Sequence, residues 1–203
     1  MHDDGVMRKT PRQARGQQRV ETIMSAAVEL FAEVGYEAAT TNEIARRAHT
    51  SIGSLYQFFP NKEAILTALI ASFREGVQAL FEEALSAPHD TRETLAAVFE
   101  RLMDRLVMIY AHEPKFRVVF YGFSTSPDFQ GAGSTLYEEI LARLGGALAT
   151  GLPELDADAR ARAALAMLVT TKAMLPYTVN AAGIDAAMTA ELKRMMTAYV
   201  RAL

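Results

Sequence analysis

Three hydroxyl side chains, Thr40, Thr41 and Ser51, stand at the expected N-termini of two short helices. Hydroxyl groups and the free backbone N–H groups of a helix N-terminus can donate hydrogen bonds to phosphate oxygens. The same hydroxyls could instead cap their helices without contacting any ligand. Thr40 also precedes Glu43 by three residues, the spacing of a capping box, in which each side chain bonds the other's backbone N–H. These residues therefore indicate phosphate binding, helix capping or both.

The hydroxyl residues fall on two short helices that a tight turn joins. A preceding helix carries apolar residues at helical spacing up to Val34, and Gly35 follows where a C-terminal glycine belongs. Pro60 ends the third helix, and Asn61 can cap the next one. Only about two residues separate the second and third helices, so the pattern predicts a helix-turn-helix. The residues expected to face inward are Val20, Ile23, Ala27, Leu30, Phe31, Val34, Ile44, Ala45, Ala48, Leu55, Phe58 and Phe59.

The third helix offers side chains that could read base pairs. Its solvent face should present Ile52, Ser54 and Gln57, because the N-terminal part of a recognition helix meets base edges. A glutamine can pair with adenine, and an isoleucine suits a thymine methyl, so we expect a half-site that contains thymine. Gly53 costs about 1 kcal/mol of helix propensity relative to alanine, which indicates either a close backbone approach to DNA or simple tolerance. Lys62 could hold a phosphate or lie idle on the surface.

The run from Thr40 to Ile65 closely resembles the N-terminal domain of the tetracycline-repressor (TetR) family, and the resemblance covers roughly residues 16–66. It implies that the hydroxyl of Tyr56, which should point away from the core, contacts a phosphate; core packing of Tyr56 is the lesser alternative. The chain departs from the family at His49 and Thr50, where glycine and valine are usual. Histidine is among the residues that tolerate a left-handed turn, so the turn stays feasible with some strain. The matching residues are Gly35–Tyr36, Ile44–Ala45, Gly53, Leu55–Tyr56, Phe59 and Lys62–Glu63.

Strand alternation does not persist anywhere in the sequence, which predicts an all-α chain of about nine helices. We expect a basic arm and helix-turn-helix DNA-binding domain at residues 1–64, and an effector-binding and dimerisation domain at 65–203. A long helix from Ala64 to Leu85 should follow the boundary. Pro176 should bend or end the helix that contains it. The later helical patterns cover residues 91–111, 114–124, 127–149, 156–179 and 185–203.

The second domain carries many large apolar side chains that suit a ligand pocket. Aromatic and methionine side chains can line a site for an apolar or aromatic molecule, because methionine adapts to irregular shapes. Their location along the chain resembles that of the family's internal effector pocket, although any one of them could be ordinary core. The candidate ligand-binding residues are Met103, Val107, Tyr110, Phe116, Phe120, Phe123, Tyr137, Met167, Met174 and Tyr177.

The last predicted helix suggests a dimer interface. Met188, Leu192, Met195 and Tyr199 follow one another at spacings of four, three and four, a heptad-like seam. The segment from Ala161 to Leu175 is apolar nearly all round, which implies one face toward its own core and one toward a partner. The resemblance implies a four-helix bundle formed by the last two helices of each protomer. A larger monomeric core is the alternative.

Charge and composition narrow the function classes. The 203 residues include no cysteine, which excludes a disulfide framework and a thiolate metal site. The net charge of the sequence is −3. The basic residues concentrate locally, because Arg8, Lys9, Arg12, Arg15 and Arg19 occur with no acid among them. An uninterrupted apolar run of about 18 residues and a signal peptide are both lacking, so we expect a cytoplasmic protein without a membrane segment.

The pattern as a whole predicts a ligand-responsive transcription regulator rather than an enzyme. Paired carboxylates in an apolar site, a nucleophile with its base, and a phosphate-binding glycine loop are all missing, and we expect no metal and no cofactor. The resemblance implies a homodimeric repressor of a palindromic operator in double-stranded DNA, released by a small apolar or aromatic effector. A helical small-molecule carrier, an activator and a regulator without a small ligand stay open.

Overall fold

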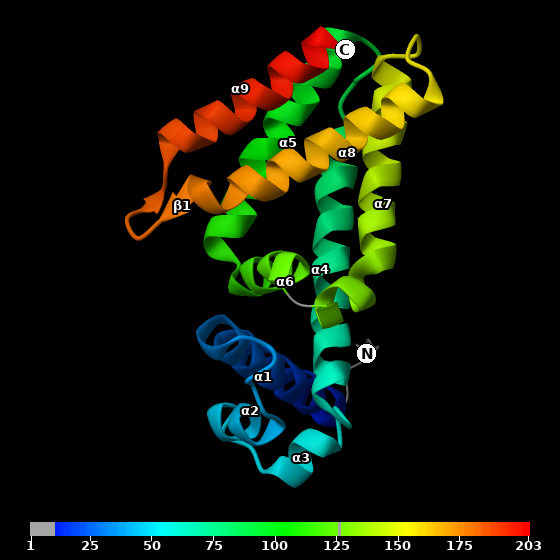
Figure 1. The fold of residues 1–203 in the computed structure, drawn as a ribbon. Coiled ribbons are helices and arrows are strands. Elements are labelled where there is room, and N and C mark those ends of the chain that lie inside the picture. Colours follow the sequence, from blue (N-terminus) through cyan, green and yellow to red (C-terminus); the bar gives the residue numbers. More distant parts are fainter. Residues whose placement is uncertain (1–10, 126) are drawn as a thin grey trace, which may run out of the picture. The chain divides into compact units, whose positions relative to one another are not determined.

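The computed structural model describes residues 11–125 and 127–203, and the side chains of residues 15–120, 122 and 134–203 (Figure 1). Arg8, Lys9 and the side chains of Arg12 and Phe123 lie outside this description. The described residues form nine α-helices, which confirms the all-α class. They are α1 (Pro11–Val34), α2 (Thr41–Arg47), α3 (Ile52–Tyr56), α4 (Lys62–Leu85), α5 (Arg92–His112), α6 (Pro114–Thr125), α7 (Pro127–Gly151), α8 (Ala157–Met174) and α9 (Ala186–Ala202).

The chain divides into two compact units, Met1–Leu69 and Ile70–Leu203. The division falls inside α4, a little later along the chain than the expected boundary at residue 64. Among the described helices, α4 alone has the length and apolar composition of a membrane span. Its large apolar side chains are buried within the protein, as in the core helix of a globular fold. The helix therefore contributes core residues to both units.

The core of the first unit forms where α1, α2, α3 and the start of α4 bury one face each. Ile23, Ile44, Leu55 and Ile65 are fully buried there. Two apolar residues expected in this core, Val34 and Phe58, are exposed instead. Val34 is the last residue of α1, and Phe58 follows the end of α3, so neither stands on a helical face that packs inward.

The turn between α2 and α3 has the hydrogen bonds of a Schellman motif. The Thr50 N–H donates to the Ala45 carbonyl at 3.0 Å, and the His49 N–H donates to the Arg46 carbonyl at 3.2 Å. His49 adopts φ 48°, the left-handed conformation that this C-terminal position requires. The sequence-based expectation for His49 is thus confirmed, and the strained residue satisfies carbonyls at the end of α2.

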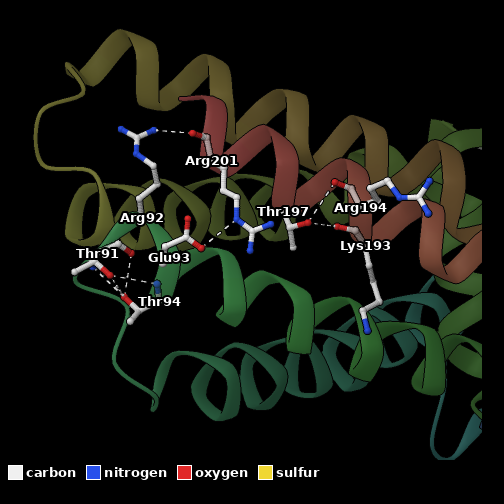
Figure 2. A network of polar contacts seen from close by, with 8 residues as sticks. All are labelled: Thr91, Arg92, Glu93, Thr94, Lys193, Arg194, Thr197 and Arg201. Atoms are coloured by element: carbon white, nitrogen blue, oxygen red, sulfur yellow. Dashed lines mark hydrogen bonds and ion pairs between the residues drawn. The ribbon is translucent and has the colours of Figure 1, made fainter.

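In the second unit, α9 lies along α5 and is tied to it by charged contacts (Figure 2). Arg201 Nε lies 3.1 Å from a carboxylate oxygen of Glu93 near the start of α5. Farther along the pair, Lys193 Nζ lies 2.9 Å from Asp104 and 3.3 Å from Glu100. The hydrogen bond to Asp104 is the main reason that the pKa of Lys193 is raised. These contacts orient α9 so that Leu192, Met196 and Val200 are buried.

The connection from α8 to α9 breaks at Pro176, as the sequence predicts, although the predicted helical pattern ran on to residue 179. The α-helix ends at Met174 and a short 3-10 helix, Leu175–Thr178, contains Pro176. This outcome follows from the proline, which lacks an N–H for the helical ladder. Two short antiparallel strands, β1 (Val179–Asn180) and β2 (Gly183–Ile184), then pair in the register Val179↔Ile184 and Asn180↔Gly183.

Candidate nucleic-acid interface and ligand cavity

Both expected N-caps form in the helix-turn-helix. The Thr40 hydroxyl accepts a hydrogen bond from the Glu43 N–H at 3.2 Å, and the Ser51 hydroxyl accepts one from the Ser54 N–H at 3.1 Å. The second half of the expected capping box is wrong, because the Glu43 carboxylate binds Arg46 instead. The hydrogen bond from Arg46 is the main reason that the pKa of Glu43 is lowered. Each cap hydroxyl still has a proton to donate outward.

Two further hydroxyls meet between α2 and α3. Thr41 Oγ1 lies 3.2 Å from the phenolic oxygen of Tyr56. Tyr56 is 49% exposed, so its ring points away from the buried face of Leu55, as expected. Only one proton is shared between the two oxygens, and the other can be donated to a third group. This arrangement suits a phosphate oxygen within reach of both hydroxyls.

The expected base-reading residues have a partner that the sequence analysis missed. Ile52 and Ser54 are half-buried, and Gln57 is exposed at the end of α3. Arg19 of α1 donates from Nη1 to the Ser54 hydroxyl oxygen at 3.1 Å. The acid-free basic run in the sequence marked Arg19 as part of an arm, but it carried no sign of this contact.

Gly53 occupies open space. A Cβ atom built on it would have no heavy atom of the described residues within 4 Å, and its φ is not positive. The described residues therefore impose no steric need for glycine at this position. A residue that costs helix stability without an internal reason is consistent with a backbone that must approach an external surface closely.

Lys62 has more contacts within the protein than the sequence indicated. Its ammonium donates to the Tyr36 carbonyl at 2.7 Å and to the Glu37 carbonyl at 3.2 Å. It also lies 4.2 Å from the centroid of the Tyr36 ring, within the range of a cation–π interaction. These contacts join the start of α4 to the segment that follows α1. The predicted phosphate contact would have to share an ammonium that already has three partners.

The remaining cations of the first unit divide into paired and unpaired groups. Arg46 binds Glu43, and Arg47 forms ion pairs with Glu33 and Glu43. Arg15 is exposed and has no ion pair with any described residue, and the described partner of Arg19 is the Ser54 hydroxyl rather than an acid. The two described arginines of this unit without an acidic partner therefore lie on the N-terminal part of α1, where they could meet phosphates.

The second unit contains a cavity of about 440 Å³. Of the predicted ligand residues, Met103, Phe116, Phe120, Tyr137 and Met167 line it. The other described candidates do not line it: Val107 and Tyr110 are buried beside it on α5, Met174 lies near the end of α8, and Tyr177 is 69% exposed. The lining that the sequence analysis missed consists of Phe73, Val77, Leu80, Phe81, Phe99, Leu102, Leu106, Ser134, Leu136, Glu138, Ile140, Leu144, Leu168, Thr171, Lys172 and Met196.

Aromatic rings organise one wall of this cavity. The rings of Phe116 and Phe120 stack with centroids 5.8 Å apart, and the Phe73 ring of α4 lies 4.5 Å from Phe116. Tyr110 packs edge-on against Phe120 at 5.7 Å, which makes it a support for the lining rather than part of it. Burial is the main cause that raises the pKa of Tyr110. Helical spacing revealed the α6 residues, but only packing brings α4 to the same wall.

The proposed dimer seam on α9 requires a correction. Leu192 is fully buried inside its own protomer, whereas Met195 is 47% exposed and Met188 and Tyr199 are half-buried. The four residues therefore do not form one outward face, because Leu192 belongs to the row that packs on α5. The outward row of α9 runs instead from half-buried Met188 through the exposed residues Glu191, Met195 and Ala198, at spacings of three and four.

Comparisons with known proteins agree with these two units. Residues 23–69 match the model of bacterial regulatory proteins of the tetR family, and residues 94–199 match the tetracyclin repressor-like C-terminal domain. The HTH-type transcriptional repressor KstR2 of Rhodococcus jostii is 30% identical over 102 residues, 47% of this chain and 50% of that protein. The A-factor receptor protein of Streptomyces griseus is 44% identical over 59 residues, 29% of this chain and 21% of that protein. The matches thus span half or less of these relatives.

Solved structures share the fold over nearly the whole chain. The fatty acid degradation regulator FadR from Bacillus halodurans superposes with a TM-score of 0.69 at 20% identity, covering 97% of this chain and 98% of that one. The regulator PfmR from Thermus thermophilus gives a TM-score of 0.66 at 25% identity, covering 89% and 97%. With both of its units matched, the chain belongs to the tetR family of bacterial transcriptional regulators.

Proposed function

We propose that the protein is a homodimeric, cytoplasmic repressor that binds a palindromic operator and leaves it when a small molecule occupies the cavity of the second unit. The observation that carries DNA binding is the pair of hydroxyls on Thr41 and Tyr56, whose oxygens lie 3.2 Å apart and leave one proton to donate to a third group. Gly53 supports DNA binding, because no contact with the described residues requires a glycine at this position. The half-sites are expected about one helical turn or a multiple apart.

The proposed dimer uses α8 and α9. Leu165 and Val169 lie four residues apart on α8 and are both exposed, as is Met195 on α9. Large apolar residues gathered on adjacent helices indicate a partner surface. A second copy fits a palindrome, since each protomer would supply one recognition helix.

The proposed effector response depends on α4. The part of α4 up to Leu69 contributes Ile65 and Leu69 to the core of the first unit, and the part after it contributes Phe73 and Val77 to the cavity lining. A molecule that changes the packing of Phe73 would act on the same helix that carries the DNA-binding unit. A coupling of about 1 to 3 kcal/mol would weaken DNA binding roughly 5- to 150-fold.

The test is footprinting of the protein on the DNA beside its own gene, with Tyr56→Phe as the matched variant. We expect a protected palindrome for the wild type and weaker protection at the same positions for the variant. A selection from genomic fragments that yields no specific site would overturn the proposal.

The cavity also favours one alternative, a helical carrier of small molecules. A carrier needs the cavity but not the DNA-facing hydroxyls. A gel shift separates the two functions, because only the regulator retards a fragment that contains the palindrome.

A further inference from the structure

The cavity has few polar side chains, and they fall into two groups. Ser134, Tyr137 and Glu138 come from α7 and are exposed, so water reaches them. Thr171 and Lys172 come from α8, where Thr171 is buried and Lys172 is half-buried. The rest of the described lining consists of hydrocarbon, aromatic and methionine side chains. A bound molecule must therefore be apolar over most of its surface.

Lys172 differs from the other half-buried lysines that the structure describes. Lys62 has two carbonyls and a ring, and Lys193 has two carboxylates, whereas Lys172 has no hydrogen bond or ion pair with any described residue. Its side chain is half-buried in the cavity wall, so an anion bound there would meet a cation that has no described partner. The position is therefore suited to an anion that the protein chain does not supply.

Thr171 provides a second donor next to it. Its hydroxyl lies 3.9 Å from the Met103 sulfur and 3.8 Å from the Met196 sulfur. Thioether sulfurs are weak acceptors, so an oxygen acceptor in the cavity would be a better partner for this proton. Thr171 and Lys172 are adjacent on α8 and both line the cavity, which places two donors beside one stretch of its wall.

We propose that the effector is an apolar molecule with one carboxylate, held by Lys172 and Thr171. This inference rests on the proposed function and names the chemical class that its effector site takes. The carboxylate accepts a charge-assisted hydrogen bond from Lys172, and the apolar body fills the space between Phe116, Met103 and Met167. Glu138 also lines the cavity, but it is exposed, and water screens its repulsion of the ligand.

The test uses three probes with the same ten-carbon chain, each below the concentration at which it aggregates: decanoate, decanol and decylammonium. Binding to the full chain is measured by titration calorimetry. We expect decanoate to bind about tenfold more tightly than decanol, as a charge-assisted hydrogen bond allows, and decylammonium to bind most weakly.

Three variants locate the head group. Lys172→Met keeps the apolar stem and should bind decanoate no better than decanol, whereas Lys172→Arg keeps the charge and should retain most of the preference. Arg162→Met removes a cation from an exposed site on the same helix, outside the cavity, and should leave the preference unchanged. Thermal unfolding without a probe should show no loss of stability in Lys172→Met, because Lys172 has no described partner to lose.

Several results would overturn the proposal. Equal affinity for decanoate and decanol, an unchanged preference in Lys172→Met, or no binding of any probe would each do so. Tightest binding of decylammonium would assign the head group to Glu138 instead. A gel shift without any probe tests the proposed function separately. If the protein binds decanoate but no DNA, the carboxylate site stands and the repressor function is refuted. If it binds a palindrome but none of the probes, the repressor function stands and the carboxylate site is refuted.

Discussion

Thr41 Oγ1 and the phenolic oxygen of Tyr56 lie 3.2 Å apart, although the two residues stand on different helices. The contact brings together two hydroxyls that lie 15 residues apart in the sequence. A single phosphate within reach of both could accept from either, so the two side chains are expected to act together.

The first prediction concerns this pair. Tyr56→Phe and Thr41→Val should each weaken DNA binding about tenfold, since a hydrogen bond to a charged group contributes about 1.5 to 3 kcal/mol. The double variant should lose less than the sum, because the second change removes a contact already impaired. Gel shifts over a salt series provide the measurement. The slope against salt should stay unchanged, since neither hydroxyl neutralises a phosphate, and strict additivity would argue against a shared contact.

The second prediction concerns Gly53. Gly53→Ala should raise the free energy of unfolding by up to about 1 kcal/mol, because alanine favours the helix and the added methyl has open space. The same variant should bind the operator much more weakly if the backbone approaches DNA closely. Urea unfolding and gel shifts on one preparation measure both effects. Gly16→Ala, in equally open space on α1, is the matched control and should gain stability without losing DNA binding. Full affinity in Gly53→Ala would leave helix tolerance as the explanation.

The third prediction concerns Arg19 and Ser54. Because Arg19 donates to the Ser54 oxygen, the hydroxyl proton is free to donate to a base. Arg19→Ala should therefore change base preference at the same base pair as Ser54→Ala, as measured by selection from a randomised half-site. Arg15→Ala, which removes an exposed cation nearby on α1, should lower affinity on all sequences and reduce the salt slope by about 0.9 if Arg15 meets a phosphate. If Arg19→Ala leaves the base preference unaltered, Arg19 contributes only to binding that does not depend on DNA sequence.

The fourth prediction concerns Lys62. Lys62→Ala should lower the stability of the first unit by about 1.5 to 3 kcal/mol, because it leaves the carbonyls of Tyr36 and Glu37 without this donor. DNA affinity measured well below the unfolding temperature should fall much less than in Tyr56→Phe. Thermal unfolding followed by circular dichroism, together with gel shifts, checks both statements. A large affinity loss in a fully stable variant would restore the phosphate contact expected from the sequence.

The fifth prediction distinguishes the proposed dimer surface on α8 and α9 from the face of α9 that is buried in its own protomer. Val169→Glu should produce monomers in analytical ultracentrifugation and abolish binding to the palindrome, because Val169 is exposed on α8 within the proposed dimer surface. Met108→Glu, at a comparably exposed apolar residue on α5, is the matched control and should remain dimeric. Leu192→Ala should instead cost about 2 to 5 kcal/mol of stability, as a truncation inside the core does. If Met108→Glu is monomeric, the dimer interface lies on α5 rather than on α8 and α9.

Local features could be read from the sequence because their causes lie within a few residues. The caps at Thr40, Ser51 and Asn61, the left-handed His49 and the break at Pro176 all depend on backbone hydrogen bonds to near neighbours. The all-α class and the helix-turn-helix follow from the same short-range rules.

Tertiary structure decided which side chains meet across helices. A heptad-like spacing identified a row of α9, but only packing on α5 shows that Leu192 faces its own core while Met195 faces outward. Likewise, the Arg19–Ser54 bond and the three partners of Lys62 involve residues that are remote in sequence, and only the packing shows that Lys172 lines the cavity without a partner among the described residues. Sequence periodicity determines which residues share one face of a helix, whereas the positions of the other helices determine what that face contacts.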